Sequence, residues 1–290
     1  MERKNRPIAL LGIPFDEQSS FSRGAAHAPA MIRSAWLSPS TNLYSENGLC
    51  IDTSAVRDLG DLDIRDKASA FATIEGAVDR ALSERDRLVC LGGDHSITYP
   101  IMRAFSRHHR DINLVQFDAH PDLYDSFEGN RHSHACPFAR IMEESLVKSL
   151  VQVGVRTMTK HTHEQAERFG VRFVDMVSLG DDLALSLKGP TYVSVDIDAL
   201  DPAFAPGVSH REPGGMTTRQ VLRIIQRLDA PIVGADIVEY NPSRDIPGMT
   251  DMVCAKIMKE LAARMLAPDI GGRGVQPRTG GRLRSRNGKR

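Results

Sequence analysis

The segment INLVQFDAHPD, residues 112–122, joins a short apolar run to three side chains that can bind a cation. The run over residues 112–117 is typical of a strand buried in a parallel sheet. Asp118, His120 and Asp122 follow at every second position, and in extended backbone such side chains point the same way. A solvated loop face is the alternative, but burying two carboxylates without a cation is costly. We therefore interpret the segment as part of a metal site.

Two further segments place similar side chains after apolar runs. In LGGDHS, residues 91–96, His95 follows two glycines, although a histidine at such a turn is commonly structural. In YVSVDIDALDP, residues 192–202, Asp196 and Asp198 alternate with apolar residues, a pattern that a half-exposed strand would also show. Ligands in parallel α/β sheets gather at the carboxyl ends of strands. We therefore expect these side chains to meet the first segment at one edge of a sheet.

Short apolar runs alternate along the chain with longer segments of helical periodicity, which is the pattern of a mainly parallel α/β sheet. The predicted strands cover residues 8–11, 88–91, 112–117, 150–153, 171–174, 192–197 and 232–237. The predicted helices cover residues 28–36, 68–85, 99–107, 137–144, 163–169, 218–228 and 250–266, the last with Thr250 as its N-cap. We expect one α/β domain over residues 1–267.

Charge is balanced over the 290 residues, with 37 basic and 37 acidic side chains, but it is unevenly distributed. Residues 268–290 are rich in glycine and in arginine, so the remainder of the chain is net acidic. This balance argues against nucleic-acid binding by the folded domain. The basic segment has almost nothing to bury and is expected to be a disordered, solvated tail, with weak affinity for nucleic acid or membrane surfaces as the alternative.

The remaining composition excludes several classes of protein. Four cysteines without a CxxC pair argue against a disulfide scaffold and against a structural zinc site. No stretch of about 18 apolar residues is present, and the first apolar run is too short for a signal peptide. We expect a cytoplasmic protein without membrane association.

The two histidines and four aspartates of the three segments have the composition of a two-metal site. Such residues suit two borderline-hard divalent cations, which carboxylates can bridge. Four carboxylates balance two such ions, and an added hydroxide leaves the site slightly negative, as a cationic substrate requires. Two metals about 3.5–4 Å apart can generate hydroxide at neutral pH.

In this order and at these separations, GGDHS, DAHPD and SVDIDALDPAFAPG resemble the metal-binding signatures of the ureohydrolase family, which includes arginases and agmatinases. The runs FEGNRHSHACPFARIMEES, residues 127–145, and APGVSHREPGG, residues 205–215, resemble its agmatinase-like plant-type arginase branch most. The resemblance extends over about residues 7–266 and implies a sheet of about eight mainly parallel strands. It also implies a homo-oligomer, commonly a trimer or hexamer, and two metal ions, usually Mn²⁺ and in some relatives Ni²⁺.

The family pattern implies a ligand set for each metal. The first metal would be held by His95, Asp118, Asp122 and Asp196, and the second by Asp118, His120, Asp196 and Asp198. Asp118 and Asp196 would then bridge the two ions. Asp122 or Asp198 would accept a proton from the nucleophile.

Two further residues match catalytic positions of the family. His134 matches its proton-shuttling histidine, and Glu239 matches the carboxylate that pairs with the substrate guanidinium. Each residue also has a plain alternative, since His134 could bond backbone at a helix start and Glu239 could be a turn acid. Ala135 departs from the glycine that commonly follows this histidine in the family.

The substrate is less defined by sequence than the reaction. The resemblance implies hydrolysis of a guanidino group to urea and an amine, with arginine and agmatine as the leading substrates. Guanidinobutyrate and free guanidine are alternatives. Residues 124–132, which include Tyr124 and Asn130, and residues 161–163 and 209–212 are expected to contact the rest of the substrate. Arg131 and Arg211 could pair with a substrate carboxylate, or they could instead be exposed or lie at a subunit contact. Two other classes remain open, a one-metal deacetylase of similar fold and a non-catalytic subunit.

Overall fold

The computed structural model describes residues 7–84 and 87–267. Its strands are β1 (Ile8–Gly12), β2 (Val56–Asp61), β3 (Leu88–Leu91), β4 (Asn113–Phe117), β5 (Ser149–Val153), β6 (Arg172–Val174), β7 (Thr191–Asp196) and β8 (Ile232–Val238). Its α-helices are α1 (Ala28–Trp36), α2 (Ala70–Glu84), α3 (Thr98–His108), α4 (Pro137–Glu143), α5 (Lys160–Phe169), α6 (Thr218–Arg227) and α7 (Thr250–Leu266). Short 3-10 helices include η4 (His95–Ile97) and η5 (Ile197–Ala199).

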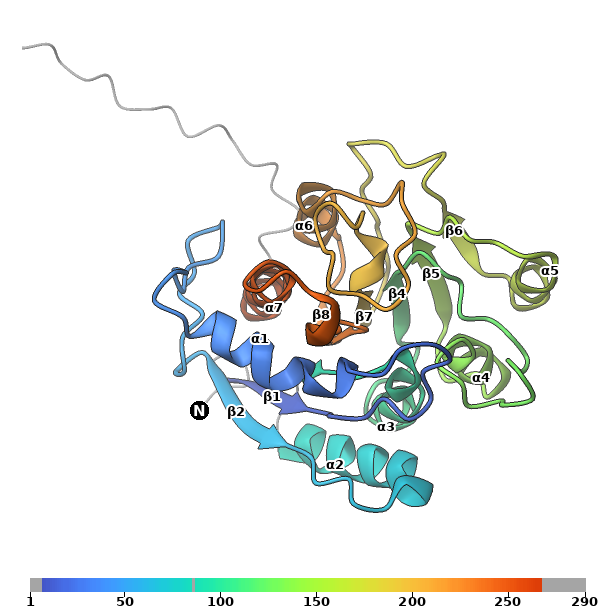
Figure 1. Cartoon of the computed structure of the whole chain (residues 1–290), viewed down its shortest axis with the longest axis horizontal. Helices are drawn as coiled ribbons and strands as arrows, with labels where there is room; N and C mark the ends of the chain where they lie inside the picture. Colours follow the sequence, from blue (N-terminus) through green and yellow to red (C-terminus); the bar gives the residue numbers. More distant parts are fainter. Residues whose placement is uncertain (1–6, 85–86, 268–290) are drawn as a thin grey trace, which may run out of the picture.

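The eight strands form one sheet in the order β2-β1-β3-β8-β7-β4-β5-β6, and all of these neighbours pair in parallel (Figure 1). The four central strands lie in the order β3-β8-β7-β4. β3 and β4 are consecutive in sequence, but β8 and β7 lie between them in the sheet. Segments far apart in the chain therefore end side by side at the carboxyl edge. This edge, where strand order reverses, is the usual ligand position of such sheets.

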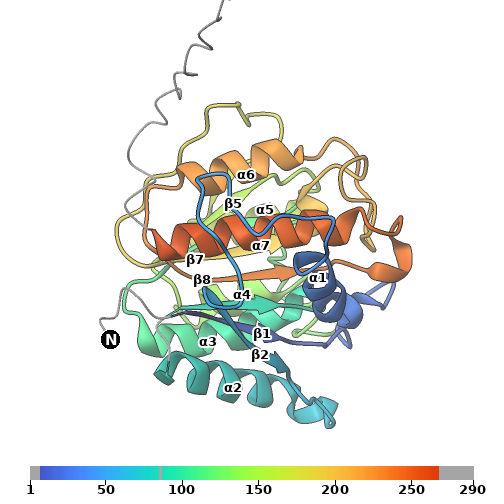
Figure 2. The same ribbon diagram turned by 90° about the vertical axis from the view of Figure 1, so that its left-hand side faces the viewer.

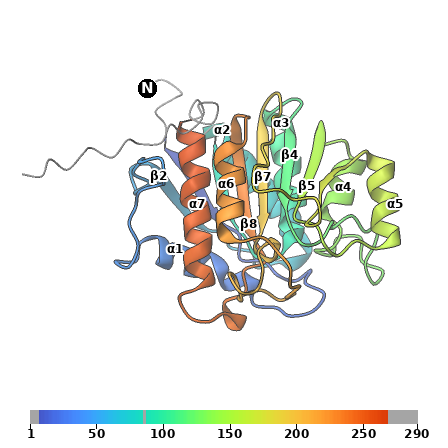
Figure 3. The ribbon, with the colours of Figure 1, turned by 90° about the horizontal axis from the view of Figure 1, so that it is seen from above.

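Helices cover both faces of the sheet, because successive side chains of its strands point to opposite sides. Ile8 and Leu10 of β1 join the core formed with α1, α6 and α7. Ala9 and Leu11 join the core formed with α2, α3, α4 and α5. Figure 2 shows α6 and α7 on one side of the sheet and α2 and α3 on the other, and Figure 3 gives the view from above.

The fold class predicted from sequence is confirmed, and all seven predicted strands are present with ends shifted by at most one residue. The eighth strand, β2, was missed. Only Val56 of its sequence VRDLGD is buried, because β2 lies at the edge of the sheet and pairs with β1 alone. A strand of this kind lacks the apolar pattern that identifies the others.

The prediction that Thr250 caps the last helix is wrong by one residue. Met249 occupies the N-cap without a side-chain hydrogen bond, and Thr250 is the first helical residue. The backbone N–H of Thr250 donates to the carboxylate of Asp245 at 3.1 Å. The acceptor for the helix start therefore comes from the preceding loop.

The predicted tail, residues 268–290, lies outside the described residues. Within the described part of the chain, no helix combines the length and the apolar character needed to cross a membrane.

Candidate metal centre

All six predicted ligands lie at the carboxyl ends of three central strands. His95 follows β3, Asp118, His120 and Asp122 follow β4, and Asp196 and Asp198 end and follow β7. The fourth central strand, β8, is followed directly by Glu239. Strand order alone therefore brings together residues up to 144 positions apart in sequence, as in the hydrogen bond between His95 and Glu239.

Each of the three ligand-bearing segments contains the same kind of turn. An aspartate at or after the end of the strand accepts, through its carboxylate, the backbone N–H two residues later. Asp94 accepts from Ser96 at 3.1 Å, Asp118 from His120 at 2.6 Å, and Asp196 from Asp198 at 2.8 Å. Aspartate favours such side-chain-to-backbone turns. The sequence pattern Asp-X-polar therefore occurs at or within a few residues of the end of each strand and places its side chains over the carboxyl edge.

This turn corrects the geometry inferred from sequence for residues 118–122. β4 ends at Phe117, and Asp122 has a φ of +49° in the left-handed region, so the segment is a loop and not extended strand. The alternation of Asp118, His120 and Asp122 identified the residues that converge, but the backbone between them is bent. A non-glycine residue held at positive φ is strained, and such strain is concentrated at functional sites.

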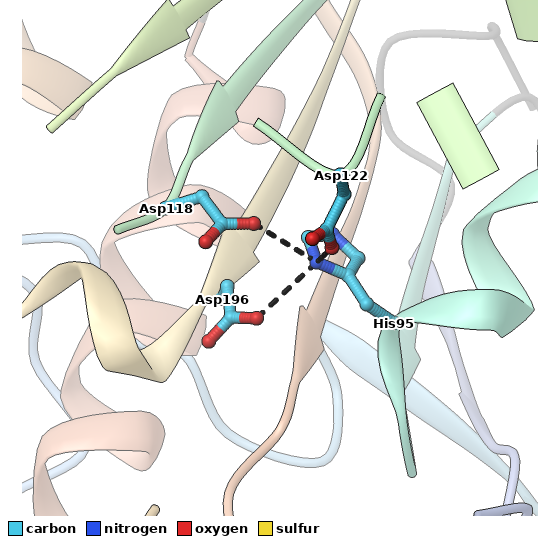
Figure 4. Close-up of side chains that lie close together, drawn as sticks. All are labelled: His95, Asp118, Asp122 and Asp196. Atoms are coloured by element: carbon cyan, nitrogen blue, oxygen red, sulfur yellow. Dashed lines mark ion pairs between the residues drawn. The ribbon is translucent and has the colours of Figure 1, made fainter. Parts of the chain in front are cut away.

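One group of side chains surrounds the imidazole of His95 (Figure 4). Its Nδ1 lies 3.1 Å from Asp118 Oδ2, 3.0 Å from Asp122 Oδ2 and 3.2 Å from Asp196 Oδ2. His95 and Asp118 are fully buried, and Nδ1 has no hydrogen-bond partner among the described residues. A buried nitrogen facing three carboxylates without a donor between them fits a cation at their centre.

The opposite nitrogen of His95 fixes its tautomer. Nε2 lies 2.9 Å from the hydroxyl of Ser194, and this hydroxyl donates to Asp236 at 2.6 Å. Because the Ser194 hydroxyl donates its one hydrogen to Asp236, its oxygen must accept the hydrogen bond from Nε2–H of His95. The lone pair of Nδ1 is then directed at the three carboxylates. Metal-ligating histidines are commonly oriented through their second nitrogen in this way.

A second group adjoins the first and consists of Asp118, His120 and Asp198. His120 Nδ1 lies 3.0 Å from Asp198 Oδ2 and 3.5 Å from Asp118 Oδ1. Asp118 belongs to both groups, which is the position expected of a bridging carboxylate. Asp196, the other predicted bridge, is placed with the first group.

The electrostatics of the cluster also indicate a cation site. Burial raises the pKa of Asp122 to about 6, and the neighbouring Asp118 adds to the shift. Burial likewise raises the pKa of Asp196 well above its usual value. Burial opposes protonation of His120, but Asp198 and Asp118 outweigh it and raise its pKa to about 12. So many carboxylates in one buried space need positive charge, which divalent metals supply.

His134 and Glu239 form a pair beside the cluster. Glu239 Oε1 lies 2.8 Å from His134 Nδ1 and accepts the backbone N–H of His95 at 2.8 Å. The backbone N–H of Ser20 donates to His134 Nε2 at 3.1 Å, and the Ser20 hydroxyl lies 2.8 Å from the same nitrogen. Since a backbone N–H can only donate, Nε2 is the acceptor and the hydrogen of His134 lies on Nδ1, toward Glu239.

A cavity of about 220 Å³ opens beside these residues. It is lined by Ser20, His120, Pro121, Asp122, Tyr124, Phe127, His134, Ala135, Thr157, Asp196, Asp198, His210 and Glu239. Tyr124, one of the two residues expected to contact the substrate, is among these lining residues. The Asn130 side chain instead donates to Gln18 at 2.7 Å and is not part of this lining.

Ser20 and Thr157 were not identified from sequence, and His210 was not singled out within its loop. Ser20 lies in a loop about 114 residues from His134, its partner, so no local pattern marks it. His210 lies between two active-site rings, with ring centroids 5.5 Å from His134 and 5.7 Å from His120. The sequence signal for His210 was its position within residues 209–212, one of the segments expected to meet the substrate.

The two arginines considered for a substrate carboxylate are engaged elsewhere. Arg131 pairs with Asp125 at 2.8 Å and with Glu143 at 2.9 Å. Arg211 donates to the carbonyls of Pro206 and Arg244. None of the residues lining the cavity is lysine or arginine.

Comparison with known proteins assigns the chain to a family. Residues 6–263 match the Arginase family. The chain belongs to the arginase family. It is 44% identical to "Arginase 1, mitochondrial" of Arabidopsis thaliana over 276 residues, which cover 89% of this chain and 80% of that protein. It is 36% identical to guanidinopropionase of Pseudomonas aeruginosa, covering 88% of this chain and 85% of that protein.

A solved structure agrees with this assignment. The arginase from Medicago truncatula superposes with a TM-score of 0.85 at 42% identity, covering 90% of this chain and 88% of that one. The arginase-family chain is accordingly a hydrolase that acts on amidino C–N bonds, as the sequence predicted. Its buried His/Asp cluster, in two groups that share Asp118, is consistent with two divalent metals. These features favour a two-metal hydrolase over a one-metal deacetylase.

Proposed function

We propose that this protein hydrolyses the guanidino group of L-arginine to urea and ornithine in a two-metal site. The observation that carries the proposal is the orphaned Nδ1 of His95, which is buried, faces three carboxylates and adjoins the second group through Asp118. His95, Asp118, Asp122 and Asp196 would hold one ion, and Asp118, His120, Asp196 and Asp198 the other. We propose Mn²⁺ as the metal, with Ni²⁺ as the alternative.

Two divalent ions in this cluster would supply the Lewis acid that activates water at neutral pH. The chain's own residues would bind and orient the substrate. Glu239 lines the cavity, and a carboxylate there would hold the substrate guanidinium through charge-assisted hydrogen bonds. Its backbone φ of +63° and its bond to the His95 N–H fix the carboxylate beside the metal groups.

His134 is placed to move protons. Its Nδ1 contacts Glu239, and its Nε2 contacts Ser20. A histidine between the guanidinium-binding carboxylate of Glu239 and a serine hydroxyl can pass a proton to the leaving amine and recover it from solvent. Asp122 or Asp198 would accept the proton of the attacking water. The positions of these residues support the two roles, since Asp122 and Asp198 line the same cavity as His134.

The lining of the cavity supports arginine as the substrate. The guanidino end would lie among acids, and the other lining residues are neutral or aromatic, with no lysine or arginine. The zwitterionic amino-acid end of arginine carries no net charge and suits such a lining. A guanidino acid would bring an unbalanced carboxylate toward a cluster of acids. The plant arginases at 44% identity support the same choice.

Agmatine is the second candidate, because its ammonium end would also suit a lining without cationic side chains. Guanidinobutyrate is a weaker alternative because of its unbalanced carboxylate, and free guanidine is a further alternative. The guanidinopropionase relative is the reason to keep a guanidino acid in the test.

The experiment is urea release from arginine, agmatine, guanidinobutyrate, guanidinopropionate and guanidine, after loading the protein with Mn²⁺ or Ni²⁺. The proposal expects the highest kcat/KM for arginine with Mn²⁺. Asp118→Ala is the matched loss-of-metal control, and it should lose both bound metal and urea release. Wild-type turnover by metal-free Asp118→Ala protein would contradict the proposal, and a higher kcat/KM for agmatine would replace arginine as the substrate.

We also propose that the protein is a homo-oligomer, a trimer or hexamer, in the cytoplasm. Light scattering after size-exclusion chromatography tests the first part, and fractionation of cells tests the second.

A further inference from the structure

Arg156 lies three residues after the carboxyl end of β5 and is half-buried beside the cluster. Its guanidinium donates to backbone carbonyls of two separate segments. Nη2 lies 2.8 Å from the carbonyl of Asp198 and 2.6 Å from that of Glu212. Longer contacts reach the carbonyls of Ala199 at 3.3 Å and Leu200 at 3.4 Å. The planar guanidinium, with five donors in a fixed fork, can satisfy several carbonyls at once.

The first of these segments carries a predicted metal ligand. η5 covers Ile197–Ala199, and the last carbonyls of a helix have no partner within it. Arg156 supplies donors to these carbonyls and so fixes the end of η5. Asp198 therefore has its main chain held by Arg156 while its carboxylate faces His120 at 3.0 Å.

The backbone of Arg156 holds the other half of the same metal group. Its N–H donates to the carbonyl of Ala119 at 2.9 Å. Ala119 lies between Asp118 and His120, and its own N–H donates to Asp198 Oδ1 at 3.1 Å. One residue thus contacts, by main chain and by side chain, both segments that form the second group. The first group depends in addition on His95 and Asp122, which Arg156 does not contact in these hydrogen bonds.

The second segment reached by the guanidinium is the loop that carries His210 to the cavity. Residues 211–214 of this loop are exposed, so little apolar burial fixes them. Nε of Arg156 adds a second bond to the carbonyl of Glu212, at 3.1 Å. The carboxylate of Asp201, just after η5, accepts the N–H of Gly214 at 2.7 Å. The loop and the end of η5 are therefore joined into one unit around Arg156.

We propose that Arg156 is a positioning residue, which holds the second metal group in register with the substrate-facing loop of His210. The inference rests on the proposed two-metal function. It assigns Arg156 no contact with the reacting atoms, because all its bonds named above go to main-chain carbonyls. Loss of the side chain should loosen Asp198 and the loop together while leaving the group around His95 in place.

Arg156→Met tests the inference, since methionine keeps the length of the stem and removes all five donors. Stepwise Mn²⁺ titration followed by metal analysis should give two ions per chain in wild type. In Arg156→Met the first ion should bind as in wild type, and the affinity for the second should fall about 10–100-fold, the usual effect of losing an outer support. Electron paramagnetic resonance should then show isolated Mn²⁺ in place of a coupled pair. KM for arginine should rise as well.

Arg223→Met is the matched control, because Arg223 on α6 also donates to a backbone carbonyl, that of Asp181 at 3.3 Å. It should bind both ions as wild type does. If Arg156→Met fails to fold, Arg156→Lys carries the test, and its second-site affinity should fall by about 3–10-fold because an ammonium cannot span the carbonyls.

Two bound ions with wild-type affinity in the folded variant would overturn the positioning role and leave the proposed function standing. A wild-type protein that binds no second ion and releases no urea would overturn both. The two failures are therefore distinguished by the wild-type titration.

Discussion

The network beneath His95 offers a quantitative test of how the metal centre is supported. Asp236 of β8 is fully buried and accepts three hydroxyl hydrogen bonds. The donors are Thr98 at 2.9 Å, Tyr192 at 2.9 Å and Ser194 at 2.6 Å. Asp236→Ala would remove the acceptor from all three donors and leave them in a space closed to water.

The expected cost follows from these contacts. A buried donor left without its acceptor costs about 1–3 kcal/mol, so three such donors set an upper range of several kcal/mol. Removing the carboxylate offsets part of this cost, because burial raises the pKa of Asp236 and so disfavours its charged form in this position. We therefore expect Asp236→Ala to lower the free energy of unfolding by about 3–5 kcal/mol.

Chemical denaturation of the metal-free protein measures this cost without the contribution of metal binding, which would otherwise add to apparent stability. Asp63→Ala is the control, because Asp63 is a surface acid whose side chain is 63% exposed. It should change stability by less than about 0.5 kcal/mol. A loss below about 1 kcal/mol for Asp236→Ala would refute the reasoning that the three hydroxyls depend on this carboxylate.

Three further predictions concern catalysis, packing and pH. His134→Asn should keep both metals and lower kcat for urea release by about 100-fold or more, and an unchanged kcat would remove the proton-transfer role. Gly93→Ala should lower stability by about 2–3 kcal/mol in thermal unfolding, since its Cβ would lie 1.8 Å from the carbonyl oxygen of Phe15. The Arg219 hydrogen bonds lower the pKa of Glu46 to about 2, so this pair stabilises the fold above pH 4.5 and loses its effect as pH falls toward 2. Arg219→Met should therefore cost about 1 kcal/mol at pH 6, reduced by solvent exposure, and progressively less below pH 4.5, and a pH-independent cost would contradict the assignment.

Much of the fold and of the metal cluster could be predicted from local sequence. Buried parallel strands carry continuous apolar runs, and the ligands follow these runs within a few residues. His95, Asp118 and Asp196 are therefore visible as polar residues that interrupt an apolar pattern at its end. The resemblance to arginases added the roles of His134 and Glu239, which the apolar pattern alone does not separate from ordinary turn residues.

The rest depended on tertiary structure. β2 has one buried residue, so its place in the sheet follows from pairing with β1 and not from its own sequence. Ser20 reaches His134 through long-range contacts of its loop, such as the hydrogen bond from the N–H of Gln18 to Asp94 at 2.9 Å. The bent backbone at Asp122 could not be deduced either, since the same alternating sequence pattern occurs in strands and in tight loops.

The central claim is that this cluster holds two metal ions, and anomalous diffraction from crystals of the Mn²⁺-loaded protein tests it most directly. Two anomalous peaks are expected about 3.5–4 Å apart, one within bonding distance of Nδ1 of His95 and one within bonding distance of Nδ1 of His120, with Asp118 between them. A single peak, or none at these nitrogens, would contradict the account.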